Sequence, residues 1–222
     1  MEHPEADEDL NVTGLVHVLE GCRKSGVEQI IFSSSAAIYG DNQNLPLLET
    51  EVPAPTSFYG LSKAVGEDYI RLYSRCFGLK HIIFRFANVY GERQGETGEG
   101  GVISVFARKI ARKEPVTVFG DGNQTRDFVY AGDIARAMSL GVGYAGCATL
   151  NVSTNEEVSL NQLIGTMEKI LGHKMDVHYG PVRPGDIYAS VLSHQALVET
   201  LGMKEYTDLE KGLAGTLAYF QK

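Results

Sequence analysis

The sequence predicts an α/β fold in which helices cover both faces of a parallel sheet. Three observations carry this prediction. Helical and extended patterns alternate through the first 91 residues, the expected strands are short apolar runs without polar alternation, and polar residues gather where those runs end. Strands buried on both faces of a parallel sheet read as continuous apolar runs. Alternation of helix with strand is typical of this fold class.

The first half of the chain supplies four elements. Apolar residues recur at helical spacing from Val12 to Leu19, and Gly26 ends that helix. We expect the next apolar run to be a strand buried on both faces, and a proline-rich loop leads from it to a long helix. The expected elements are a helix ending at residue 25, a strand at 29–32, a helix at 59–77 and a strand at 81–86.

The pattern changes after Gly91, where a loop rich in glycine and glutamate covers residues 92–101. We therefore predict two units: residues 1–91 carry the sheet, and residues 92–222 mainly form a smaller lobe, with 120–152 returning in part to the sheet. The elements expected after residue 101 are helices at 102–112, 133–141, 160–171, 193–201 and 209–220, and extended pieces at 116–119, 127–130, 149–152 and 175–179.

Composition narrows the classes of partner. The chain has 222 residues, 43% hydrophobic residues and a net charge of −8, which disfavours nucleic acid and anionic membrane as partners. It shows no apolar run long enough to span a membrane and no signal peptide. The three cysteines are widely spaced, so we expect a reduced, cytoplasmic protein. The histidines form no metal-ligand pattern, and we expect no metal.

The most informative polar residues are Tyr59 and Lys63, which follow a run of three serines ending at Ser35. Positions i and i+4 lie on one face of a helix, so the phenol and the ammonium point the same way. A free phenol has a pKa of about 10, and a neighbouring cation favours its ionised form. A hydroxyl from Ser35 could hold the oxygen being deprotonated. Together these groups suit a base that oxidises an alcohol beside a hydride acceptor.

A nucleotide-binding parallel sheet normally opens with a strand, a glycine-rich turn and a helix, and this sequence shows no such opening. Its one G-x-G-x-x-G run, from Gly141 to Gly146, follows an expected helix and precedes an expected strand, so we interpret it as a loop. In the loop at 92–101, Glu96 and Glu99 would repel a pyrophosphate, and we expect a substrate loop there. We expect the chain to begin inside a larger fold, lacking about 80 residues at about 30 residues per β–α–β unit.

Six ordered stretches of the sequence match the motifs of a known family. They are Asn11–Gly14, Phe32–Gly40, Tyr59–Lys63, Arg85–Gly91, Gly120–Tyr130 and Arg183–Asp186. They resemble the extended short-chain dehydrogenase/reductase family, and within it the nucleotide-sugar epimerases of the UDP-glucose 4-epimerase type, and the resemblance covers essentially the whole chain. It implies a doubly wound, Rossmann-like parallel sheet missing its first strands in residues 1–91, the later part of an NAD-binding domain, and an α/β substrate-binding lobe in 92–222.

The resemblance implies NAD-dependent inversion at C4 of a nucleotide-linked hexose, UDP-glucose or UDP-galactose or their N-acetyl forms, through a 4-keto intermediate. Tyr59 would take the C4 hydroxyl proton while hydride passes to the nicotinamide, Ser35 would hold the C4 oxygen, and Lys63 would bind the nicotinamide ribose. A small residue at 190 suggests room for an N-acetyl group, and a homodimer is implied. The residues implied at the cofactor are Ser33, Tyr59 and Lys63, and those at the substrate are Ser35, Asn88, Arg126, Arg183, Asp186 and Ser190.

Other interpretations stay open. A nucleotide-sugar 4,6-dehydratase or a decarboxylase is the alternative within the family, although Ala36 and Ala37 stand where dehydratases commonly carry an acidic pair. A non-catalytic remnant or binding module is the alternative of another class. Individual residues also have plainer explanations. Ser33 and Ser34 could cap a turn, Tyr39 could serve packing, Arg126 could pair with Asp127 or Asp121, and the segment at Arg183 could be a bare turn.

Overall fold

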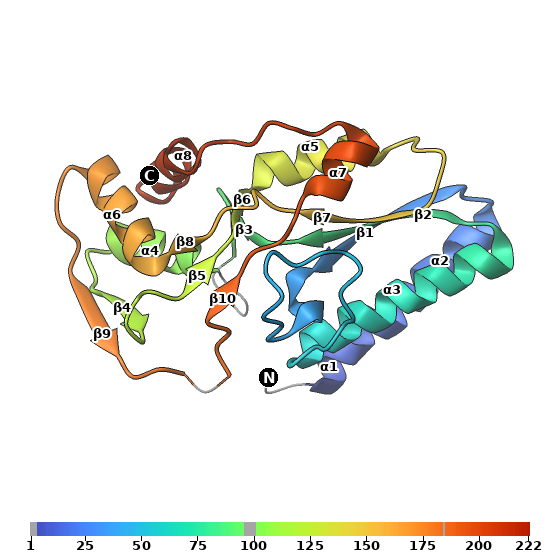
Figure 1. Ribbon diagram of the computed structural model, residues 1–222, viewed down its shortest axis with the longest axis horizontal. Coiled ribbons are helices and arrows are strands. Elements are labelled where there is room, and N and C mark those ends of the chain that lie inside the picture. The colour runs from blue at the N-terminus through green and yellow to red at the C-terminus, as the bar shows by residue number, and fades with distance from the viewer. Residues whose placement is uncertain (1–3, 96–100, 184) are drawn as a thin grey trace.

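The computed structural model describes residues 4–95, 101–183 and 185–222, and it has the predicted α/β fold (Figure 1). Its central sheet has three parallel strands, with β2 (Lys80–Phe86) between β1 (Gln29–Ser35) and β7 (Ala148–Val152). Ser35 pairs with Phe86 at the end of the β1–β2 ladder. The carboxyl ends of the three strands therefore share one edge of the sheet.

Helices cover both faces of this sheet (Figure 1). On one face lie α2 (Gly14–Ser25) and α3 (Phe58–Phe77), and on the other lie α5 (Ala131–Gly141) and α7 (Gln195–Leu201). Alternate residues of the strands divide between these layers, because successive side chains of a strand point to opposite faces. In β2, for example, Ile83 packs with the α2 and α3 cluster, whereas Ile82 and Phe84 pack with the α5 and α7 cluster.

The second lobe consists of short strands covered by three helices around a separate apolar cluster (Figure 1). β4 pairs with β9, and β3 with β6, in parallel; β5 lies between β8, which is antiparallel to it, and β10, which is parallel. The elements are β3 (Asn88–Tyr90), α4 (Val102–Ala111), β4 (Val116–Phe119), β5 (Thr125–Arg126), β6 (Phe128–Tyr130), β8 (Val158–Ser159), α6 (Leu160–Leu171), β9 (Val177–Gly180), β10 (Ala189–Ser190) and α8 (Leu209–Phe220).

The helices and longer strands lie close to their predicted bounds. Gly26 ends α2 with a left-handed φ of 66°, and its N–H donates to the carbonyl of Cys22, the usual role of glycine after a helix. At the start of α3, the hydroxyl of Ser57 accepts from the N–H of Gly60 and caps the helix. The two-unit division at residue 91 stays a prediction, although β7 and α5 do return to the central sheet.

One strand differs from its prediction. We expected Gln29–Phe32 to be buried on both faces, but the residues of β1 up to Phe32 are only half-buried and Ser33 is exposed. The physical reason is the position of β1, which has β2 on one side and forms the edge of the described sheet. An apolar run indicates a strand but does not distinguish a central strand from an edge strand.

Several short elements were not predicted. A helix α1 (Pro4–Glu8) continues through a π-helical turn at Asp9–Thr13 into α2, and a 3₁₀ turn covers Ala36–Tyr39. The strands β3, β5, β8 and β10 have two or three residues each, too few to show a period. Among the described residues, no helix combines the length and the apolar character that crossing a bilayer requires.

The two glycine-rich segments have different outcomes. Gly141 ends α5, where a Cβ would come within 3.0 Å of Ile82 Cδ1, and Gly143 has a φ of 79°. The segment then leads into β7, so the G-x-G-x-x-G run is a loop, as predicted. In the loop at 92–101, residues 96–100 lie outside the described residues.

Close contact brings the start of α3 against the turn that follows β1. A Cβ at Gly60 would lie 2.5 Å from the carbonyl oxygen of Ala37, and one at Gly66 would lie 3.0 Å from both Leu15 and Phe32. These two glycines allow α3 to approach the sheet and the 3₁₀ turn more closely than any side chain would permit. The approach places Tyr59 beside the turn that begins at Ser35.

Replacement of Gly60 by alanine tests this contact. Alanine ordinarily stabilises a helix by about 1 kcal/mol relative to glycine, but here we expect destabilisation of about 1–3 kcal/mol because the methyl group meets backbone. Gly21→Ala in α2 is the matched control, since nothing lies within 4 Å of the added Cβ, and it should stabilise the protein. Urea unfolding measures the change in unfolding free energy of each variant. A change of the same sign in both variants would contradict the close-contact argument.

Candidate active site

The three serines at the end of β1 have three different surroundings. Ser33 is exposed, Ser34 is buried, and Ser35 is half-buried. The hydroxyl of Ser35 accepts from the N–H of Ala37 at 3.2 Å and so caps the 3₁₀ turn. The hydroxyl of Ser34 donates to the carboxylate of Glu67 at 2.6 Å. The capping role considered for Ser34 is therefore wrong and belongs to Ser35.

Tyr59 and Lys63 lie together on α3. The Nζ of Lys63 is 5.5 Å from the ring centroid of Tyr59 and 5.2 Å from that of Phe32 in β1. Both distances lie within the range of a cation–π contact. The i, i+4 spacing thus places the ammonium beside the phenol, at the edge of the sheet where the serines lie. Their chemical roles stay predictions.

A cavity of about 420 Å³ joins the sheet edge to the second lobe. Five residues that the sequence singled out lie along its wall, and they come from both lobes. Small and hydroxyl-bearing side chains form most of the rest, so the cavity presents hydrogen-bonding groups with little steric bulk. The predicted residues are Ser35, Asn88, Arg126, Asp186 and Ser190, and the others include Ala36, Ala37, Thr56, Ser57 and Ala87.

Arg126 supplies the cationic side chain of this cavity wall. Its Nη1 donates to the carbonyls of Thr125 at 2.7 Å and Tyr188 at 3.4 Å. Burial lowers the pKa of Arg126, and the nearby carboxylate of Asp186 opposes that effect. The alternative in which Asp127 pairs with Arg126 is not what the structure shows, because that carboxylate accepts from Thr154 and the N–H of Asn155.

The predicted residues that do not line this cavity are Ser33, Tyr59, Lys63 and Arg183. The guanidinium carbon of Arg183 is 3.6 Å from the centroid of the Phe119 ring. The carbonyl of Arg183 accepts from the N–H of Asp186 at 3.2 Å, which closes a turn. Pro184 lies outside the described residues.

The sequence did not predict a buried polar network that lies next to the candidate site. Glu67, fully buried on α3, accepts from Arg85 Nε at 3.0 Å and from Arg85 Nη2 at 2.7 Å. Arg85 Nη1 donates to the hydroxyl of Tyr39, which in turn donates to Asn151 of β7. Burial raises the pKa of Tyr39 to about 12. Tyr39, expected to serve packing alone, is therefore also a hydrogen-bonding link from the 3₁₀ turn to two strands, β2 and β7.

The same contacts determine the ionisation of Glu67. Burial disfavours the charged carboxylate, but the hydrogen bonds and charge of Arg85, with contributions from Ser34 and Arg71, hold the pKa of Glu67 below its ordinary value. One sequence signal could have revealed this residue. Glu67 stands four residues after Lys63 and eight after Tyr59, so all three share one face of α3.

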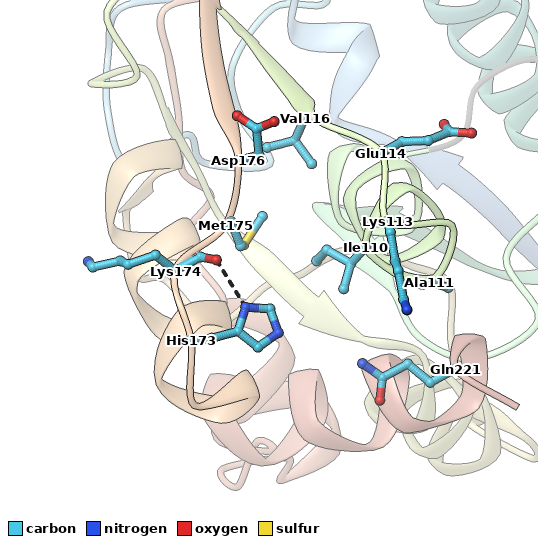
Figure 2. Close-up of a pocket in the computed structure, with 10 residues that line it drawn as sticks. All are labelled: Ile110, Ala111, Lys113, Glu114, Val116, His173, Lys174, Met175, Asp176 and Gln221. Carbon is cyan, nitrogen blue, oxygen red and sulfur yellow. Dashed lines mark hydrogen bonds between the residues drawn. The ribbon is translucent and has the colours of Figure 1, made fainter.

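A second cavity, of about 450 Å³, lies in the second lobe where the carboxyl ends of α4, α6 and α8 meet (Figure 2). Lys113, His173 and Asp176 lie at its rim, with Ile110 and Met175 between them. The ring of His173 shares a 2.9 Å hydrogen bond with the carbonyl of Lys174. This cavity contains none of the residues that the sequence singled out, and the sheet-edge cavity is the candidate active site.

Comparison with known proteins shows the family of the chain. The model of the NAD dependent epimerase/dehydratase family matches residues 1–144. The chain belongs to that family. A putative UDP-glucose 4-epimerase from Methanocaldococcus jannaschii is 42% identical over 214 residues, which cover 96% of this chain and 70% of that protein.

Solved structures show the same similarity. The UDP-glucose 4-epimerase of Thermotoga maritima, solved with UDP-glucose, matches with a TM-score of 0.94 and 39% identity over 99% of this chain and 72% of that one. The UDP-N-acetylglucosamine 4-epimerase of Methanobrevibacter ruminantium, in complex with UDP-N-acetylmuramic acid, matches with a TM-score of 0.92 and 32% identity over 96% and 69%. The family is NAD-dependent, as the resemblance implied.

The depressed pKa of Glu67 predicts a pH-dependent contribution to stability. The contribution is present above the unfolded pKa of 4.5 and is lost as the pH falls through the lower folded pKa. At pH 7, Glu67→Gln should lose about 3–5 kcal/mol of unfolding free energy, because Arg85 is left buried without its charge partner.

The difference from the wild type should shrink as the pH falls below 4.5. Urea unfolding at pH 7, 4 and 3 measures it. Asp68→Asn is the control, because Asp68 is 82% exposed and its pair with Arg71 lies at the surface, where such pairs contribute little. A loss for Glu67→Gln that is the same at every pH would contradict the ionised state of this carboxylate.

Proposed function

We propose that this protein inverts the configuration at C4 of a nucleotide-linked hexose, with NAD as its cofactor and a 4-keto sugar as the intermediate. The observation that carries the proposal is the placement of Lys63 Nζ 5.5 Å from the Tyr59 ring, at the sheet edge where Ser35 enters a cavity shared with Arg126. An activated phenol, a hydroxyl and an anion-binding cation are the groups that oxidation of a phosphate-linked sugar alcohol requires.

Each catalytic residue has a distinct task. Tyr59 acts as the base that takes the C4 hydroxyl proton, and it returns a proton when the ketone is reduced. The ammonium of Lys63 stabilises the phenolate through its charge. Ser35 donates to the C4 oxygen, since its hydroxyl lines the cavity and its lone pair is oriented by the N–H of Ala37. NAD supplies the hydride acceptor and donor.

The described residues fit one end of the cofactor. Lys63 and Tyr59 offer donors to a nicotinamide ribose, and the exposed Ser33 lies at the same edge of the sheet. Ala36, Ala37 and Ala87 leave the neighbouring wall free of bulk. Among the described residues, none of the central strands β1, β2 and β7 is followed by a glycine-rich turn and a helix that could cradle a pyrophosphate.

The second lobe is proposed to hold the nucleotide. Arg126 is anchored through Nη1 to two carbonyls, so its other nitrogens can donate to a phosphate in the cavity. We assign Asn88 to the pyrophosphate and Asp186 to the nucleotide ribose, because both line the cavity with Arg126. Arg183 stays a proposed phosphate ligand, and it would have to leave the ring of Phe119 to reach the cavity.

The alanines argue for epimerisation within this family. A 4,6-dehydratase needs an acid and a base to remove the C5 proton and the C6 hydroxyl, and Ala36 and Ala37 line the cavity where that pair would stand. Methyl groups transfer no protons. The alternative of a non-catalytic binding module is tested by titration with NAD and with UDP.

We also propose that the protein is a cytoplasmic homodimer that pairs through α3. Leu61, Tyr69, Leu72 and Phe77 of that helix are exposed, and each shows more than a third of its surface, so association would bury apolar area. The cysteines Cys22, Cys76 and Cys147 are free thiols, which suits a reducing compartment.

Replacement of Tyr59 by phenylalanine tests the base. Turnover of the nucleotide sugar should fall by a factor of about 10³ or more, because the proton acceptor is lost, while the affinities for NAD and UDP stay nearly unchanged. Calorimetric titration and a coupled epimerase assay measure these quantities. Tyr219→Phe removes an exposed hydroxyl from α8, a helix that contributes no residue to the cavity, and is the matched control. Turnover that survives in Tyr59→Phe would refute the assignment.

Substrate size is tested at Ser190. This small side chain lines the cavity beside Arg126, and we propose that it leaves room for an N-acetyl group. Ser190→Tyr should lower kcat/KM for UDP-N-acetylglucosamine by about 10²-fold or more and leave that for UDP-glucose within about tenfold, because the added ring clashes only with the larger substituent. Equal losses on both substrates would contradict this role.

A further inference from the structure

Glu67 shares one face of α3 with Tyr59 and Lys63, at successive spacings of four residues. Tyr59 and Lys63 are assigned above to proton transfer. Glu67 lies at the buried end of this row and is fully shielded from solvent. Because the backbone of a helix is rigid over two turns, whatever holds Glu67 also limits where the other two side chains can lie.

The carboxylate of Glu67 receives donors from three elements. Oε1 accepts from Ser34 Oγ at 2.6 Å and from Arg85 Nε at 3.0 Å. Oε2 accepts from Arg85 Nη2 and from Arg71 Nη2, each at 2.7 Å. Ser34 and Arg85 are direct partners across the β1–β2 ladder. Glu67 therefore attaches α3 to a single rung of the sheet.

That rung is next to the residues that enter the site. Ser34 immediately precedes Ser35, and Arg85 stands three residues before Asn88. From the helix side, Lys63 lies over the ring of Phe32, another β1 residue. A displacement of α3 along the sheet would change the distances from Tyr59 and Lys63 to Ser35 together.

We propose that Glu67 is a positioning residue that, through its hydrogen bond with Ser34, sets the register of α3 against β1 and so aligns Tyr59 and Lys63 with Ser35. The inference rests on the proposed function of those three residues. Apolar contacts are non-directional and allow a helix to slide, whereas a carboxylate held by a forked guanidinium and a hydroxyl accepts one orientation.

Ser34→Ala is the sharpest test, because it removes the hydrogen bond between α3 and β1 and leaves the Glu67–Arg85 ion pair between α3 and β2 in place. Tyr39→Phe is the matched control. It also removes one buried hydroxyl from the same network, but that hydroxyl contacts Arg85 and Asn151 and does not touch α3. Ser34→Thr retains the hydroxyl and serves as the conservative rescue.

The main readout needs neither cofactor nor turnover. Tyrosine labelled with ¹³C at Cζ reports the titration of each phenol by NMR, and the signal lost in Tyr59→Phe identifies Tyr59. We expect Ser34→Ala to raise the proton affinity of the Tyr59 phenolate by about threefold or more, because Lys63 no longer lies in its place. Tyr39→Phe and Ser34→Thr should titrate like the wild type, even where thermal unfolding shows that they lose as much stability as Ser34→Ala.

The outcomes separate two failures. If Ser34→Ala loses stability but leaves the titration of Tyr59 unchanged, the network is only structural and the positioning role is overturned. If Tyr39→Phe disturbs Tyr59 as much as Ser34→Ala does, the effect is general loosening and the proposal also fails. If Tyr59 of the wild type titrates like a free phenol, with a pKa of about 10, Lys63 does not activate it, and both the positioning role and the proposed base are refuted.

Discussion

The ion pair between Glu67 and Arg85 connects the parts of the candidate site. A buried carboxylate without partners would be costly, because the protein interior solvates charge poorly. Here the carboxylate accepts four hydrogen bonds, and the guanidinium that balances its charge also donates to Tyr39 and to the carbonyl of Glu49. These hydrogen bonds form together only when β1, β2 and α3 occupy their present positions. The buried charge of Glu67 therefore also helps to specify how α3 packs on the sheet.

Sterics and hydrogen bonding act on different degrees of freedom of α3. Gly60 and Gly66 determine how closely the helix approaches the turn and the sheet, since a Cβ at either position would meet atoms within 3.0 Å. Close approach alone does not select one register along the strand. The directional contacts of Glu67 select one register. They thereby fix the positions of Tyr59 and Lys63, which lie on the same helix. The predicted i, i+4 relation is thus necessary for the site, and the anchoring below it determines where that pair points.

Local sequence patterns predict the features of this structure that depend on residues close together in the sequence. The Tyr59–Lys63 relation is a property of one helix, and the ends of α2 and α3 follow from Gly26 and Gly78 in left-handed conformations. Contacts between distant residues had no such signal. Ser34 and Glu67 are 33 residues apart, and only the packing of α3 on the sheet brings them together. The half-buried state of β1 and the stacking of Arg183 on Phe119 are likewise decided by what lies next to them in space.

The second lobe contributes through a pairing too short to be recognised from sequence. β5 and β10 place Arg126 directly opposite Ser190, and neighbouring strands are about 4.8 Å apart. In the proposed substrate the diphosphate is bonded to the sugar ring, so the group that binds phosphate and the side chain that limits sugar size must be close neighbours. Two residues on one rung meet that requirement. In the proposed function, the lobe therefore recognises the junction between nucleotide and sugar, while the sheet edge, aligned by Glu67, supplies the groups that act on the sugar alcohol.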